Sequence, residues 1–181
     1  MSTLARFIPS ARLTAIGSGL AVFVIVLDQV TKLWILNGLG FMEGGPGTRI
    51  DVLDPWFNLT MVWNRGVSFG LFAAESLWTR LLLIGFSLAI AGVIAFWLTR
   101  AERMLQALAF GLIIGGAIGN VIDRVAYGAV ADFLDFSGLW FPYVFNVADA
   151  AISVGVAGLV LDVILNGSER KPDSATGKVP D

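Results

Sequence analysis

Long runs of hydrophobic residues divide the chain into four segments. The stretch between Arg80 and Arg100 is free of charged residues, and a helix of about 20 residues spans ~30 Å, the thickness of a bilayer's hydrocarbon core. A second uncharged run begins at Met104, and two further runs carry few charges. We therefore predict four transmembrane helices, over about 13–35, 80–100, 104–123 and 145–165.

The longest segment between these runs, residues 36–79, has a different pattern. Apolar residues alternate along one stretch, at Phe57, Leu59, Met61 and Trp63, and the alternation resumes over 67–71 after turn-forming residues 64–66. This predicts a small β-hairpin with one apolar face. Because the segment has too little mass to bury that face, we expect the face to rest on the membrane surface or over a groove between helices.

The predicted fold is an all-α membrane protein, a four-transmembrane-helix bundle with a small extracytoplasmic β-sheet or hairpin, in one domain covering 1–181. Most of the 12 basic residues lie in residues 1–13, at Arg100 and Arg103, and after residue 166. The positive-inside rule therefore places both termini in the cytoplasm. Tryptophans near span ends fit an aromatic belt: Trp34, Trp78, Trp97 and Trp140. The polar tail, 166–181, is expected to be disordered and cytoplasmic.

Composition narrows the possible chemistry. Hydrophobic residues make up 56% of the chain, mean hydropathy is +0.79, and the net charge is -2 without a basic patch, so no nucleic-acid partner is expected. The chain has no Cys and no His, which excludes disulfides, thiolate nucleophiles and Ser-His catalysis and removes the commonest metal ligands. We expect neither a metal nor a cofactor.

Acidic residues gather near one end of the predicted helices. They are Asp28, Asp123, Asp132, Asp135 and Asp149. Asn120, Asp123 and Arg124 lie within a helical turn of one another, and Asn146 precedes Asp149 by three residues, so the two helix ends bring carboxylates and amides together. Two close carboxylates share one proton, so one serves as an acid and the other as a base. Such a pair can activate water without a metal, His or Cys.

Several roles remain open for these residues on the basis of pattern alone. Each acid could form a structural ion pair; Asp28 and Lys32 are one turn apart and suit this role. A Ser-Lys scheme is less favoured because Ser68, Ser76 and Ser137 fall in loops or the hairpin. A transporter would hold its acids at mid-membrane depth in broken helices, and a membrane scaffold would use them only to tie helices together. A glycine every four residues, at Gly111, Gly115 and Gly119, predicts close helix packing.

Five sequence blocks resemble the lipoprotein signal peptidase (signal peptidase II) family, in the family's order. They are DQVTK (28–32), NRGVSFG (64–70), GGAIGNVIDR (115–124), VADF (130–133) and FNVADAAI (145–152). The resemblance implies a four-span aspartic protease of the bacterial inner membrane with its active site at the extracytoplasmic face. We expect a monomer. Its substrate would be a diacylglyceryl-modified prolipoprotein, cut before the lipidated cysteine, and its inhibitors would include the family's antibiotics such as globomycin.

The same resemblance implies roles for individual residues. The catalytic aspartates would be Asp132 and Asp149, which leaves Asp135 without a catalytic role. Supporting or substrate-binding residues would be Asp28, Lys32, Asn64, Gly66, Asn120, Asp123, Arg124 and Asn146. The chain departs from the family pattern F-P-x-F-N at FPYVFN, where both Tyr143 and Val144 separate Pro142 from Phe145. This extra residue bears on the path of the loop before Asp149.

Overall fold

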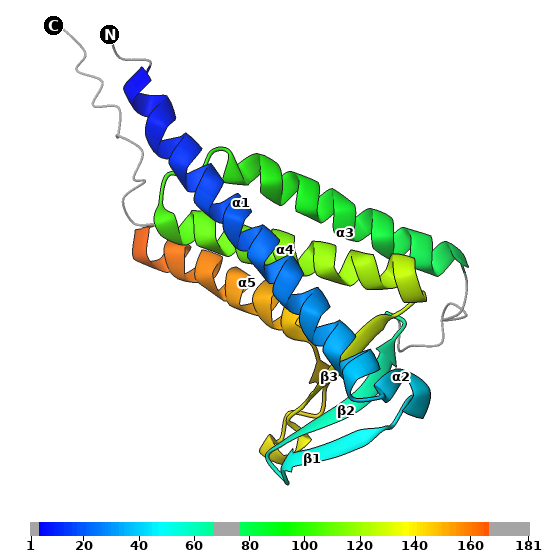
Figure 1. Cartoon of the computed structure of the whole chain (residues 1–181). Helices are drawn as coiled ribbons and strands as arrows, with labels where there is room; N and C mark the ends of the chain where they lie inside the picture. Colours follow the sequence, from blue (N-terminus) through cyan, green and yellow to red (C-terminus); the bar gives the residue numbers. More distant parts are fainter. Residues whose placement is uncertain (1–3, 67–76, 167–181) are drawn as a thin grey trace, which may run out of the picture.

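Four long helices form a bundle in the computed structural model, which describes residues 4–66 and 77–166. They are α1 (Leu4–Leu33), α3 (Leu77–Leu98), α4 (Met104–Tyr127) and α5 (Val147–Asn166). Each is long and apolar enough to cross a membrane, which confirms the predicted four-span bundle. Figure 1 shows that α1 begins and α5 ends at the same end of the bundle, while the sheet lies at the opposite end.

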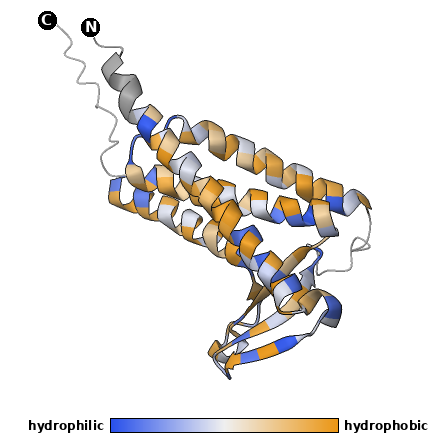
Figure 2. Ribbon diagram, viewed as in Figure 1, coloured by the Kyte–Doolittle hydropathy of each residue, from blue (hydrophilic) through white to orange (hydrophobic). Residues whose placement is uncertain are grey.

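Helix α4 is the centre of the bundle, and the other three helices pack around it. It is the most buried span, whereas α1, α3 and α5 expose large apolar side chains such as Leu82, Phe86 and Ile164. Figure 2 shows that hydrophobic residues cover the outer faces of these helices. Exposed apolar surface of this extent suits contact with lipid and not with water, so the chain is a multi-pass membrane protein.

The glycines of α4 let its neighbours approach closely, as predicted. A side chain at Gly111 would collide with the backbone of Gly17 on α1, and one at Gly119 would meet the Asp28 carboxylate. On another face of α4, a side chain at Gly116 would collide with the backbone of Ala148 on α5. These close approaches fix α1 and α5 against α4 along the bundle.

The sheet has four antiparallel strands in the order β1-β2-β3-β4. They are β1 (Arg49–Leu53), β2 (Phe57–Asn64), β3 (Val130–Asp135) and β4 (Val144–Phe145). A π-helical turn, Trp34–Gly38, and the short helix α2 (Phe41–Gly44) connect α1 to β1. Strand β3 follows α4, and β4 leads into α5, so within the described residues the sheet is joined to α1, α4 and α5.

The alternation along β2 is correctly predicted, but the partners and the cover of this strand are not. Strand β2 pairs with β1 and β3, and the second strand of the predicted hairpin, 67–71, lies outside the described residues. The apolar face of β2 is buried on Ile35, Leu36 and Phe41. The expectation that this segment is too small to bury the face, which would then rest on the membrane or over a groove between helices, was therefore wrong, because the residues directly after α1 fold back over it.

Candidate active site

A buried ion cluster joins α1 to α4 at the sheet end of the bundle. Lys32 Nζ lies 2.8 Å from Asp28 Oδ2 and 2.8 Å from Asp123 Oδ2. The three side chains are at most 2% exposed. The predicted ion pair of Asp28 and Lys32 is therefore present, and Asp123 extends it to α4. A buried charge needs such partners because leaving it unpaired costs several kcal/mol, on the order of 3–5.

The two acids of this cluster also bind the main chain beside the candidate catalytic residues. Asp123 Oδ2 accepts a hydrogen bond from the backbone N–H of Ala131 at 3.1 Å, and Asp28 Oδ1 accepts one from the N–H of Ala148 at 2.9 Å. Ala131 immediately precedes Asp132, and Ala148 immediately precedes Asp149. Each candidate catalytic residue is thus adjacent to an amide held by the same ion cluster.

Amide side chains connect the carboxylates of Asp132 and Asp149. Asn146 Nδ2 donates to Asp132 Oδ1 at 2.7 Å, and Asn120 Nδ2 donates to Asp149 Oδ1 at 2.7 Å. The two amides meet where Asn146 Nδ2 lies 3.3 Å from Asn120 Oδ1. Asn64 Nδ2 donates to the other oxygen of Asp132 at 3.0 Å. Two residues from separate elements, β3 and α5, are thus brought into one hydrogen-bonded network.

The start of α5 places Asp149 by helix capping. Asn146 directly precedes the helix, and its Oδ1 accepts the N–H of Asp149 at 2.9 Å, as an N-cap residue does for the third residue of a helix. Asp149 therefore lies in the first turn of α5, where the positive end of the helix dipole favours a negative charge. The i, i+3 spacing in the sequence is explained by this cap.

The environments of the two acids on β3 differ. Burial, together with the negative charge of Asp149, raises the pKa of Asp132 to about 7, although hydrogen bonds from Asn64 and Asn146 oppose the shift. Burial acts in the same direction on Asp135, but hydrogen bonds from Thr60 and Ser137 outweigh it and lower its pKa. Asp132 is therefore the β3 acid that can hold a proton near neutral pH.

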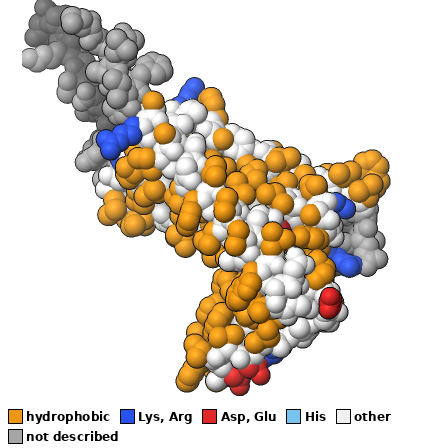
Figure 3. Space-filling model, viewed as in Figure 1, with side chains coloured by type: hydrophobic (Ala, Val, Ile, Leu, Met, Phe, Trp, Pro, Cys, Tyr) orange, Lys and Arg blue, Asp and Glu red, His pale blue; other side chains and the backbone are white. Residues whose placement is uncertain are grey.

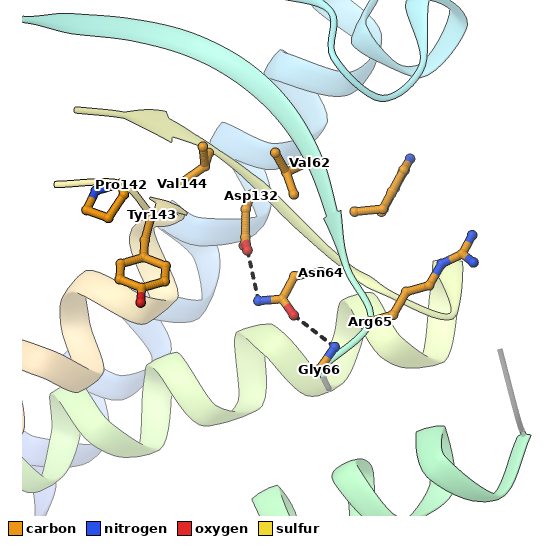
Figure 4. A pocket seen from close by; sticks show the side chains of 9 residues that line it. Val62, Asn64, Arg65, Gly66, Asp132, Pro142, Tyr143 and Val144 are labelled. Carbon is orange, nitrogen blue, oxygen red and sulfur yellow. Dashed lines mark hydrogen bonds between the residues drawn. The ribbon is translucent and has the colours of Figure 1, made fainter. Parts of the chain in front are cut away.

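A pocket of about 440 Å³ opens beside Asp132. Its lining comes from the end of β2 and the residues after it, from Asp132 on β3, and from the segment that enters β4: Val62, Trp63, Asn64, Arg65, Gly66, Asp132, Pro142, Tyr143 and Val144. Figure 4 shows the Asp132 carboxylate between Asn64 and Tyr143, with Asn64 also bonded to the N–H of Gly66. Gly66 has φ +91°, a conformation that suits glycine. The FPYVFN departure therefore lies in the wall of this pocket, while β4 still leads directly into Asn146.

A second cavity, of about 200 Å³, lies between α3, α4 and α5. Apolar side chains make up most of its lining, and Asn120 and Arg124 are polar members of it: Phe86, Ser87, Ile90, Ile113, Ala117, Asn120, Arg124 and Ile152. Arg124 NH1 reaches the backbone oxygen of Asn120 at 3.3 Å. The cavity therefore extends from lipid-facing helices to the residue that contacts Asp149.

The structure brings all of the sequence-predicted site residues to this region, and it adds two that sequence reasoning missed. Gln29 Nε2 lies within 3.2 Å of Asp28 Oδ2, Asp123 Oδ1 and the Gly119 oxygen. Thr60 Oγ1 donates to Asp135 at 2.6 Å, which accounts for that acid structurally. Gln29 lies inside the DQVTK block, directly after Asp28, and this position is the feature of the sequence that could have identified it as a site residue. Thr60 is marked only by the polar alternation of β2.

Comparisons with known proteins agree on one family. The family model described as Signal peptidase (SPase) II matches residues 20–165. The chain is 52% identical over 156 residues to a lipoprotein signal peptidase of Caulobacter vibrioides, covering 86% of this chain and 90% of that protein. It is 48% identical over 165 residues to one of Methylorubrum extorquens, covering 90% and 94%.

A solved structure described as a bacterial membrane enzyme has the same fold. It superposes with a TM-score of 0.73 at 25% identity, over 88% of this chain and 94% of the solved chain. The matched residues include the ion cluster, Asp132 and Asp149. The chain therefore belongs to the signal peptidase II family of membrane proteases.

Proposed function

We propose that this protease removes the signal peptide from diacylglyceryl-modified prolipoproteins by cutting before the lipidated cysteine, with Asp132 and Asp149 as its catalytic pair. The observation that carries the proposal is the raised pKa of Asp132 beside the charge of Asp149, in a site where amides join both carboxylates. Two acids that influence each other's protonation can divide the roles of acid and base. The chain has neither His nor Cys to act as a base or a nucleophile in their place.

In the proposed mechanism, Asp149 is the base and Asp132 is the acid. Ionised Asp149 takes a proton from a water held between the carboxylates, and the hydroxide oxygen attacks the scissile carbonyl. Asp132 donates its proton to the carbonyl oxygen, which gives a neutral tetrahedral intermediate. Its collapse breaks the C–N bond as Asp149 returns its proton to the leaving nitrogen and Asp132 takes one back. The products are a signal-peptide carboxyl group and a free amino group on the lipidated cysteine.

The two cavities suit the two parts of this substrate. The 440 Å³ pocket beside Asp132 presents the polar edge of β2, including Asn64, to a peptide. The 200 Å³ cavity opens among lipid-facing helices and is mostly apolar, so it suits an acyl chain. Arg124 lies in its lining on the side of Asn120, where it can contact the peptide backbone near the lipidated residue. A substrate anchored by its acyl chains would then reach Asp132 and Asp149 from the bilayer.

Charge placement supports an orientation in the bacterial inner membrane. Arg12, Arg100 and Arg103 lie at the bundle end opposite the sheet, and short basic segments favour the cytoplasmic side. We propose that both termini are cytoplasmic and that the dyad lies at the extracytoplasmic face. We further propose that the chain acts as a monomer and that globomycin-like antibiotics, which the family resemblance implies as inhibitors, occupy the pocket beside Asp132.

The rival functions have less support. Among the described residues, the acids near Asp132 and Asp149 lie close to helix ends. Helix α4 continues unbroken past Asn120 and Asp123, whereas transporters hold their charged residues in broken helices at mid-membrane depth. A scaffold would use Asp132 and Asp149 for stability alone. The raised pKa of Asp132 is unfavourable for that role, because a structural ion pair would stabilise the charged form.

Replacing either catalytic aspartate should abolish cleavage. We expect Asp132→Asn and Asp149→Asn to lower kcat for a diacylglyceryl-modified precursor by at least roughly a thousandfold, within the range of general acid-base catalysis, while the melting temperature in detergent stays near that of the original protein. Asp135→Asn, on the same strand, is the matched control and should retain most cleavage. Normal cleavage by either dyad variant would refute the assignment.

Cleavage should also decline at high pH. Because the pKa of Asp132 is raised to about 7, this group is protonated below that pH and loses its proton above it. The acid would then be missing, so kcat/KM for the precursor is expected to fall on the basic side with an apparent pKa near 7. A pH profile in detergent measures this. A kcat/KM that keeps rising well above neutral pH would contradict the role of Asp132 as the acid.

Filling the apolar cavity should weaken binding of the lipidated substrate. Ser87 lines the cavity, and Ser87→Trp is expected to raise KM for the diacylglyceryl precursor by roughly tenfold, which corresponds to about 1.4 kcal/mol, with kcat little changed. Leu88→Trp, at an exposed neighbouring position of α3, is the matched control and should leave KM unchanged. Equal KM values for the two variants would show that the acyl chain binds elsewhere.

A further inference from the structure

We propose that the free tip of the sheet inserts into the headgroup region of the bilayer and anchors the pocket wall to the lipid surface. Two turns form this tip, one between β1 and β2 and the other between β3 and β4. Their exposed apolar residues constitute what we term the tip patch: Leu53, Trp56, Leu139, Trp140, Phe141 and Tyr143. The occupant of this surface is the lipid of the leaflet beside the bundle.

The two turns form a single surface. A side chain at Gly138 would collide with the backbone of Pro55, so the second turn lies directly on the first. Beneath the turns, the rings of Phe57 and Phe136 lie 4.9 Å apart, and Phe141 contacts Phe145 at 5.7 Å between ring centres. Aromatic contacts beneath the patch therefore hold both turns in place.

Trp140 is the most unusual residue of the patch. Its side chain is 96% exposed, and its φ of +63° is the one positive value among the non-glycine residues that the structure describes. A bulky residue in this conformation costs free energy, and the described fold gives the indole ring little contact in return. Trp56 at 59% and Tyr143 at 69% are also exposed. Trp and Tyr are the residues enriched where a membrane meets water.

The position of the sheet brings this patch to the membrane surface. The strands run across the direction of the helices, and the sheet projects sideways from the end of the bundle (Figure 1). In a bilayer it therefore lies over the lipid beside the helices. Figure 3 shows hydrophobic side chains continuing from the helices along one side of the sheet, with acidic side chains at its far end and on its other side. The apolar surface is thus continuous with the lipid-facing surface of the spans.

The charged side chains near the tip pair with one another. Arg49 Nε lies 2.7 Å from Asp51 Oδ1, and Arg49 NH2 lies 2.9 Å from Asp54 Oδ1. Asp51 pairs across the sheet with Asn58, on the polar face of β2. The acidic residues of this region, including Asp54 between Leu53 and Trp56, are thus paired with Arg49, while the residues of the patch are uncharged. This division matches a structure that lies in an interface.

The consequence concerns the pocket beside Asp132. Tyr143 belongs both to the tip patch and to the lining of that pocket, so lipid contact at the tip would fix the height of the pocket wall above the bilayer. This consequence rests on the proposed function, whereas the insertion of the tip does not.

Site-directed spin labelling tests the insertion, because the chain has no Cys and an introduced thiol is its only one. Trp140→Cys, labelled with a nitroxide and reconstituted in phosphatidylcholine/phosphatidylglycerol vesicles, should be several-fold more accessible to oxygen than to a water-soluble nickel chelate, relative to Asp51→Cys. Leu82→Cys, at an exposed position of α3, gives the value for a site in lipid. The melting temperature in detergent should be unchanged in all three variants, since each site is exposed.

Three outcomes would overturn the proposal. The first is a label at position 140 that is as accessible to the nickel chelate as the label at position 51, which shows a tip in water. The second is a label that leaves water only when precursor is added, which assigns the patch to the substrate. The third is protection that depends on protein density in the vesicles, which assigns the patch to a second copy of the chain. None of these results depends on whether Asp132 and Asp149 are catalytic.

Discussion

Lys32 lies between two buried carboxylates, and the geometry of the site depends on this contact. Asp28 and Asp123 are fully buried, and such charges are tolerated in a membrane protein only with a close counter-charge and hydrogen bonds. Lys32 supplies the charge to both, at 2.8 Å. The two acids also accept hydrogen bonds from the backbone N–H groups of Ala131, on β3, and Ala148, at the start of α5. The cluster that joins α1 to α4 therefore also fixes β3 and the start of α5.

This arrangement explains how a mostly apolar chain can hold the carboxylates of Asp132 and Asp149 in one site. Asp132 and Asp149 come from different elements, and direct repulsion between them would separate a flexible site. The ion cluster fixes their backbones, Asn146 and Asn120 link their side chains, and the cap of α5 places Asp149 in the first turn of that helix. The helices around them face lipid, so the proposed substrate could keep its acyl chains in the bilayer while its peptide reaches the two carboxylates.

The four helices could be predicted from the sequence alone, because an uncharged run of membrane length can satisfy its backbone hydrogen bonds in lipid by forming a helix. The close glycine contacts of α4 were predicted as well. The sequence also indicated the two faces of β2, but alternation does not identify a strand's partners, so the pairing with β1 and β3 and the cover by Ile35 and Phe41 were missed. The acids were found as a group. Which of them share a site required the resemblance to a family, since Asp132 and Asp135 differ only in tertiary contacts such as that of Thr60.

A double-mutant cycle on Lys32 and Asp123 tests most directly whether the ion cluster holds the site together. Lys32→Met leaves two buried carboxylates without a cation and is expected to lower the free energy of unfolding by about 3–5 kcal/mol and to abolish precursor cleavage. Adding Asp123→Asn, whose amide oxygen can still accept the Ala131 N–H, returns the cluster to a single negative charge and should recover part of that stability. Losses that simply add, or a Lys32→Met variant as stable and active as the original protein, would contradict the account.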